Sequence, residues 1–148
     1  MDDMDRLIIN EIQSDFPIHP RPFEVLGARL NLSGAEVMER IQALKQEGVI
    51  RRIGGNFNSK RLNFSSTLCA AKVPDENLDQ FVETVNSYSG VTHNYLRKHE
   101  YNVWFTFIGP DMAYIDQALK TICKTTGVTE IRNLPALKTF KIKVDFSV

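Results

Sequence analysis

The chain has 148 residues with 18 basic and 18 acidic side chains, so its formal net charge is zero. This balance argues against a protein that binds nucleic acid or membranes through bulk charge, although it leaves room for a local basic patch. The N-terminus lacks the features of a signal peptide, the two cysteines match no metal spacing, and no apolar stretch is long enough to span a membrane. We therefore expect a folded cytoplasmic protein.

Helical periodicity dominates the first part of the chain. A first helix is predicted around Leu7, Ile8 and Ile12, and Pro17 closes it. A short second helix is predicted from Pro22 to Leu30. This region is therefore expected to form a small helical bundle.

A third helix and a β-wing complete the first predicted domain. Ser33 is a natural N-cap, Glu36 completes a capping box, and Gly48 ends the helix. Residues 49–57 are expected to form a hairpin that turns at a Gly-Gly pair. Three helices followed by such a wing predict a winged helix-turn-helix domain over residues 1–60.

The second part of the chain, residues 61–148, alternates strand and helix patterns. We expect strands at residues 65–73, 91–97, 101–108 and 128–133. One helix is expected to begin at residue 74, after the first strand, and another at residue 110, after the third. This βαββαβ order predicts a ferredoxin-like domain and an α+β fold class. The final stretch alternates, with Phe140, Ile142, Val144 and Phe146 facing inward, and is expected to add a strand to that sheet.

The run "LSGAEVMERIQALKQEGVIRRI", followed by a βαββαβ half, resembles the Lrp/AsnC family of regulators. The resemblance implies an N-terminal winged helix and a C-terminal ligand-sensing, dimerising sheet. However, the helix Gly34–Glu47 that would enter the major groove is net acidic. Proteins bind duplex DNA with Lys and Arg side chains that neutralise its phosphates, so the acidic composition of this helix argues against DNA as a partner. The compact basic group lies beyond that helix, at Arg51, Arg52, Lys60 and Arg61.

The stretch "HNYLRKHEYNVWF", residues 93–105, holds two of the three histidines and the one tryptophan. With a four-residue loop over 98–101, strand alternation gives the hairpin two unlike faces. One is an apolar core face of Leu96, Val103, Phe105 and Phe107, with Asn94 as its polar member. The other carries His93, Tyr95, Arg97, Asn102, Trp104 and Thr106, with His99 at its rim on the loop.

This second face has the chemistry of a binding surface for a large, flat, acidic ligand. Aromatic side chains suit a planar molecule, arginine binds carboxylates bidentately, and an imidazole can ligate iron or deliver a proton. Each residue alone also has a simpler explanation, such as a surface ion pair between Arg97 and Glu100. Six such residues on one face favour a site for a tetrapyrrole with acidic side chains.

The full motif "THNYLRKHEYNVWFT" closely resembles that of the siroheme decarboxylases. The resemblance implies removal of carbon dioxide from two acetate side chains of siroheme, giving 12,18-didecarboxysiroheme for alternative heme or heme d1 synthesis. It implies no cofactor beyond the siroheme substrate and its iron. It also implies a related sister subunit in a heterodimer, while a homodimer stays open.

With this family in view, we assign expected roles. The catalytic candidates are His93, His99, Tyr95 and Arg97, and either histidine is the general acid or an axial ligand of the siroheme iron. The substrate-binding candidates are Arg97, Asn102, Trp104, Arg51, Arg52, Arg132, Lys138 and Lys141. Two alternatives remain open: a DNA-binding regulator that senses heme or an amino acid, and a non-catalytic partner subunit of the decarboxylase.

Overall fold

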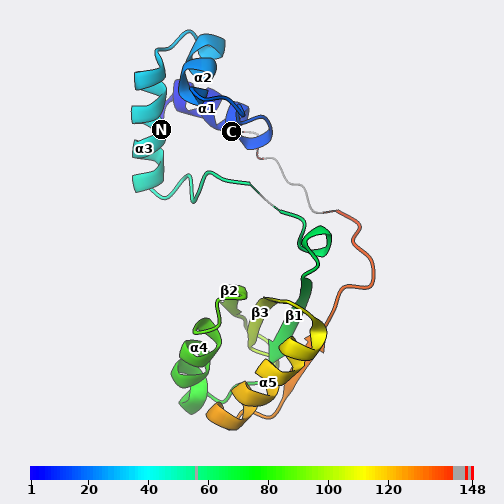
Figure 1. Ribbon diagram of the computed structural model, residues 1–148. Helices are drawn as coiled ribbons and strands as arrows, with labels where there is room; N and C mark the ends of the chain where they lie inside the picture. The colour runs from blue at the N-terminus through cyan, green and yellow to red at the C-terminus, as the bar shows by residue number, and fades with distance from the viewer. Residues whose placement is uncertain (56, 142–145, 147) are drawn as a thin grey trace. The chain divides into compact units, whose positions relative to one another are not determined.

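The computed structural model describes residues 1–55, 57–141, 146 and 148 (Figure 1). The chain forms two compact units. The first unit consists of Met1–Gly55 together with Lys141–Val148, and the second unit is Asn56–Phe140. Within the described part of the chain, no helix is long and apolar enough to cross a membrane.

The first unit contains the three predicted helices, α1 Asp3–Ser14, α2 Pro22–Leu30 and α3 Gly34–Gln46. The predicted capping box is confirmed: the N–H of Glu36 donates to Ser33 Oγ (3.2 Å), and the N–H of Ser33 donates to Glu36 Oε2 (2.9 Å). These bonds satisfy amides that a helix start leaves without partners, which fixes where α3 begins.

The core of the first unit forms where the apolar faces of its helices meet. Ile8, Leu26 and Val37, one from each helix, are fully buried. Gly48 follows α3 with φ +76°, a left-handed conformation that glycine adopts without strain, and so ends the helix as predicted.

The predicted β-wing is not formed by the described residues between 49 and 58, none of which is in a strand. A two-residue hairpin turn at this Gly-Gly pair requires a positive φ at its first glycine, and the φ of Gly54 is not positive. The chain instead runs on into a short 3₁₀ helix, Ser59–Leu62. The wing was therefore wrongly predicted, although the helix-turn-helix part was correct.

The C-terminal residues also differ from prediction where the structure describes them. Gln13 of α1 exchanges two hydrogen bonds with the backbone of Phe146 (2.8 and 2.7 Å), and Asn10 does the same with Val148 (2.9 and 3.4 Å). These residues thus belong to the first unit, and Phe140, which was expected to face inward, is 87% exposed. The rest of the predicted extra strand, residues 142–145, lies outside the described residues.

The second unit has the predicted strand and helix order. The elements are β1 Ser65–Ala71, α4 Leu78–Asn86, β2 Val91–Leu96, β3 Val103–Gly109, α5 Met112–Thr126 and β4 Ile131–Leu134, with a 3₁₀ turn Asp75–Asn77 before α4. The sheet order is β2-β3-β1-β4 and every neighbouring pair is antiparallel. This is the ferredoxin-like arrangement, so the predicted α+β fold class is confirmed.

Helices α4 and α5 lie together on one face of this sheet (Figure 1). Phe81 and Ile115 from the helices, with Phe105 and Phe107 from β3, form the centre of the core at 1% exposure or less. We call the opposite side of the sheet the open face, because neither α4 nor α5 covers it.

Candidate functional site

The β2–β3 hairpin has the predicted register. The N–H of Arg97 donates to the carbonyl of Asn102 (2.7 Å), which closes a four-residue loop. A β-bulge at Thr92 shifts the pairing toward the start of β2. The cross-strand pairs beyond the bulge are His93 with Thr106, Tyr95 with Trp104, and Leu96 with Val103.

The two faces of the hairpin differ as their residues predict, with one exception. Val103, Phe105 and Phe107 point into the helix side and are buried. Leu96, which was expected in the core, is 65% exposed because it lies at the end of β2 next to the loop. On the open face Tyr95 is half exposed and Trp104 is partly buried.

The open face carries a continuous row of ring and guanidinium contacts across the end of the sheet. Because Arg132 pairs with Ala70 and Ala70 pairs with Trp104, β4 joins the same row as the hairpin. We call this row the aromatic band. Its members are His93, Tyr95, Arg97, His99, Tyr101, Trp104 and Arg132.

One half of the band is built on the loop. The Arg132 guanidinium carbon lies 4.6 Å from the centre of the Tyr101 ring. The His99 ring lies 6.4 Å from Tyr101 and 6.4 Å from Trp104, measured between ring centres. Tyr101 was not among the predicted site residues; its place in the motif, two residues after His99, was the signal that could have identified it.

The other half of the band is built on β2. The guanidinium carbon of Arg97 lies 5.8 Å from the Tyr95 ring centre and 6.0 Å from that of Trp104. The His93 ring lies 6.1 Å from Tyr95 with 28° between the planes. Arginine is attracted to the faces of aromatic rings, so these contacts hold the cation at the surface of the band.

Neither band arginine has a carboxylate within ion-pair distance in the described part of the chain. The alternative ion pair between Arg97 and Glu100 is not formed, since Glu100 binds Lys72 Nζ (3.0 Å). That bond is the main cause that lowers the pKa of Glu100. The pKa of Arg132 is raised chiefly by the Tyr101 side chain. Both guanidinium groups can therefore meet an external carboxylate.

The two histidines have different hydrogen-bond partners. Nδ1 of His99 accepts the backbone N–H of Tyr101 (3.0 Å), so a neutral His99 carries its proton on Nε2. Nδ1 of His93 lies 3.1 Å from Thr92 Oγ1, and a hydroxyl can donate or accept. His99 is therefore held as an Nε2 proton donor, whereas His93 can leave its Nε2 lone pair free for a metal ion.

Asn102, a predicted substrate-binding residue, bonds the protein backbone through its side chain. Its Nδ2 donates to the carbonyl of Val73 and its Oδ1 accepts the N–H of Val73, both at 2.8 Å. The amide thereby continues the β1–β3 pairing beyond the end of both strands. Because both polar atoms are engaged, Asn102 braces the loop from which the band is built.

The remaining basic candidates lie outside the band. Lys138 and Lys141 are exposed, and Lys138 lies over the ring of Phe140 (5.3 Å to its centre). Arg51 and Arg52 belong to the first unit, where they line an apolar hollow of about 560 Å³ with residues of α1.

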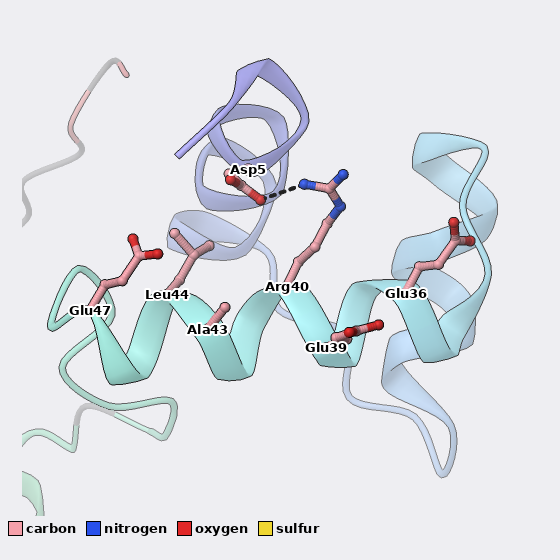
Figure 2. A pocket seen from close by; sticks show the side chains of 7 residues that line it. All are labelled: Asp5, Glu36, Glu39, Arg40, Ala43, Leu44 and Glu47. Carbon is pink, nitrogen blue, oxygen red and sulfur yellow. Dashed lines mark hydrogen bonds and ion pairs between the residues drawn. The ribbon is translucent and has the colours of Figure 1, made fainter.

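The surface of α3 is acidic, as its sequence predicts. A hollow of about 410 Å³ there is lined by Asp5, by Glu36 and Glu39 of α3, and by Glu47, which follows the last residue of α3 (Figure 2). Arg40 turns toward α1 and bonds Asp5 and Asp2 (2.8 Å each). Since this cation is already paired, α3 offers little that could neutralise DNA phosphates.

The described residues include no group of three His, Cys, Asp or Glu side chains placed to hold a metal ion. Both cysteines are free thiols. Burial raises the pKa of Cys69 to about 12, which keeps that thiol protonated and unreactive.

Two protein-family models match the chain. Residues 5–51 match the siroheme decarboxylase NirDL-like HTH domain, and residues 61–141 match the AsnC-like ligand binding domain. The siroheme decarboxylase alpha subunit of Oleidesulfovibrio alaskensis is 52% identical over all of this chain and 90% of its own length.

Solved structures agree with these matches. A crystal structure of the siroheme decarboxylase NirDL, in co-complex with an iron-uroporphyrin III analogue, has a TM-score of 0.70 and is 27% identical over 97% of this chain and 48% of that one. An AsnC family transcriptional regulator from Agrobacterium tumefaciens (23% identical, TM-score 0.77, 99% and 96% covered) shares the fold.

The fold and the two family matches define a helix-turn-helix protein whose second unit is an AsnC-like ligand binding domain. More particularly, the chain belongs to the family of siroheme decarboxylase subunits.

Proposed function

We propose that this chain takes part in removing carbon dioxide from two acetate side chains of siroheme, giving didecarboxysiroheme. The observation that carries this proposal is the guanidinium of Arg97, which has no ion pair among the described residues and lies against Trp104 and Tyr95 on an open sheet face. A flat macrocycle with several carboxylates fits a surface of aromatic rings and free cations.

The reaction needs an electron sink and a proton. When the bond between the methylene carbon and the carboxyl carbon breaks, the electron pair stays with the macrocycle, whose conjugated system accepts it. One proton then completes the new methyl group, and carbon dioxide leaves. Arg97 positions the carboxylate before the bond breaks, and the partly buried face of Trp104 limits the access of water.

The hydrogen bonds of the histidines favour a division of roles. His99, with its proton on Nε2, acts as the general acid, because Nε2–H is the donor left after Nδ1 has accepted the Tyr101 amide. His93 acts as the axial ligand of the siroheme iron, with Thr92 Oγ1 accepting its Nδ1–H.

A related subunit or a second copy of this chain completes the enzyme. Relatives named alpha subunit and NirD subunit support this inference by their names. The free thiols of Cys69 and Cys123 support a reducing compartment, the cytoplasm.

Anaerobic incubation with siroheme, followed by mass spectrometry of the extracted pigment, tests this proposal. The chain is assayed alone and with any related subunit that co-purifies. We expect loss of two carbon dioxide masses, slowed about 10²- to 10⁴-fold by His99→Ala. His93→Ala is expected to change the visible absorption spectrum of bound siroheme.

The matched control is His19→Ala. Like His99, His19 accepts a backbone N–H at Nδ1 (Arg21, 3.1 Å), but it lies in the first unit. Its removal is expected to leave turnover unchanged. Siroheme that binds but keeps its mass, even with the related subunit present, contradicts the enzymatic role and favours a non-catalytic binding subunit.

A further inference from the structure

The aromatic band contains the same three-residue arrangement twice. His93 lies beside Tyr95, with ring centres 6.1 Å apart and 28° between planes. His99 lies beside Tyr101 in nearly the same geometry, 6.4 Å and 29°. In both pairs the tyrosine follows the histidine by two positions.

Each of these tyrosines also has its own arginine. Arg97 lies over Tyr95 at 5.8 Å, and Arg132 lies over Tyr101 at 4.6 Å. The first arginine follows its tyrosine by two positions on the hairpin, whereas the second comes from β4 across the sheet. The sequence therefore does not reveal the second set, which forms only when β4 pairs with β1.

Trp104 lies between the two sets. Its ring contacts Arg97 of one set (6.0 Å) and His99 of the other (6.4 Å). Its Nε1–H donates to the carbonyl of Tyr101 (2.6 Å), which fixes the indole in this central place. A planar ligand that contacts this indole would have one set at either side.

The charges of the two sets are also alike. The pKa of Arg132 is raised first by a hydrogen bond to the Tyr101 side chain and less by the charges of Glu100 and Glu130, which form their ion pairs with Lys72 (3.0 and 3.9 Å). Arg132, like Arg97, has no ion pair in the described part of the chain, and its donors not bonded to Tyr101 can meet an external carboxylate.

We infer that the two sets are separate subsites, each receiving one of the two carboxylate arms that lose carbon dioxide. This inference rests on the proposed function and assigns Arg132 with Tyr101 to a second subsite beside that of Arg97 with Tyr95. His93 keeps its role as ligand of the iron, and His99 remains the acid that protonates both arms. In each subsite the arginine binds the carboxylate that leaves as carbon dioxide. The electron pair remains on the macrocycle and one proton is taken up per arm, so no oxidant or reductant is consumed.

The separate variants Arg97→Gln and Arg132→Gln test this assignment. Both side chains are exposed, so the substitutions are expected to leave the fold intact. The readout is an anaerobic time course in which chromatography separates the two singly decarboxylated isomers. Each variant is expected to accumulate one isomer, opposite in the two cases, because one loss slows roughly tenfold or more while the other keeps its rate.

Lys120→Gln is the matched control, since it removes an exposed cation of the same unit on α5, the helix that lies on the other face of the sheet. It is expected to accumulate neither isomer. If both band variants slow the two losses equally and give the same isomer mixture, the two-subsite assignment is overturned while the decarboxylase stands. If the unmodified protein with its related subunit leaves the mass of siroheme unchanged, the proposed function fails as well.

Discussion

Two arginines of the first unit and two of the second have opposite surroundings. In the first unit Arg29 bonds two carboxylates (2.6 and 3.0 Å) and Arg40 bonds two others (2.8 Å each). In the second unit Arg97 and Arg132 lie over aromatic rings and have no ion pair among the described residues. A net charge of zero therefore conceals two different surfaces, one internally neutralised and one able to bind an anion.

The largest effect is expected when Arg97 is given a carboxylate partner within the protein, as Arg29 and Arg40 have in the first unit. Tyr95→Glu introduces one on the same face of β2, and Tyr95→Gln is its neutral control. We expect siroheme to bind the Glu variant roughly 10- to 100-fold more weakly than the Gln variant, because an internal partner replaces the ligand carboxylate. An absorption titration with siroheme measures both dissociation constants.

A second control separates this local effect from general repulsion. Leu96→Glu adds the same charge one residue further along the hairpin, on the opposite face. It is expected to weaken binding much less. Equal affinities of the Tyr95→Glu and Tyr95→Gln proteins would show that Arg97 does not meet a carboxylate of the ligand.

Loss of the two hydrogen bonds between the Asn102 side chain and the Val73 backbone is expected to have an intermediate effect, on the stability of the fold. Asn102→Ala leaves the N–H and carbonyl of Val73 without their partner and is expected to lower the free energy of unfolding by about 1–3 kcal/mol. Asn94→Ala is the matched change, since Asn94 makes only an exposed side-chain bond to Asn86 (3.0 Å). Urea denaturation measures both; similar stabilities of the two variants would contradict the bracing role.

The smallest effect is expected in the first unit, where the ion pairs are exposed. The hydrogen bond from Arg40 is the main cause that lowers the pKa of Asp2 from 3.8 to about 2. The pair therefore stabilises the fold above pH 3.8, and this contribution is lost as the pH falls through about 2.

Arg40→Gln should accordingly return the pKa of Asp2 toward 3.8 and leave turnover of siroheme unchanged. An NMR titration of the Asp2 carboxyl group measures the shift. A pKa that stays near 2 in the variant would mean that the capping bond from the Asp5 amide, rather than Arg40, holds the carboxylate ionised.

The predictions from sequence succeeded where local rules decide the structure. The capping box at Ser33 and the hairpin register follow from contacts a few residues apart, and both are confirmed. They give no contacts where a distant segment decides, although Arg132 was named as a substrate-binding candidate. The place of Arg132 beside Tyr101 depends on β4 pairing with β1, and the bond between Asn102 and Val73 joins residues 29 positions apart.

The predicted wing shows a different kind of error, in which a local sequence signal, the Gly-Gly pair, predicted a hairpin that the described residues do not form. A Gly-Gly pair permits a tight turn but does not require one, because glycine is also free to take ordinary φ values. The stretch from Val49 to Gly54 instead borders the apolar hollow on α1. Periodicity alone gives no indication that packing against α1 replaces strand pairing here.

The alternation of β3 has an evolutionary consequence. Its odd positions, from Val103 to Phe107, are buried against the helices, while Trp104 and Thr106 face the other way. Substitutions on the outward positions can therefore change ligand chemistry without disturbing the packing that keeps the domain folded. A sheet built in this way lets one architecture diversify into gene regulators and enzymes, since selection can act on each side of the same strand independently.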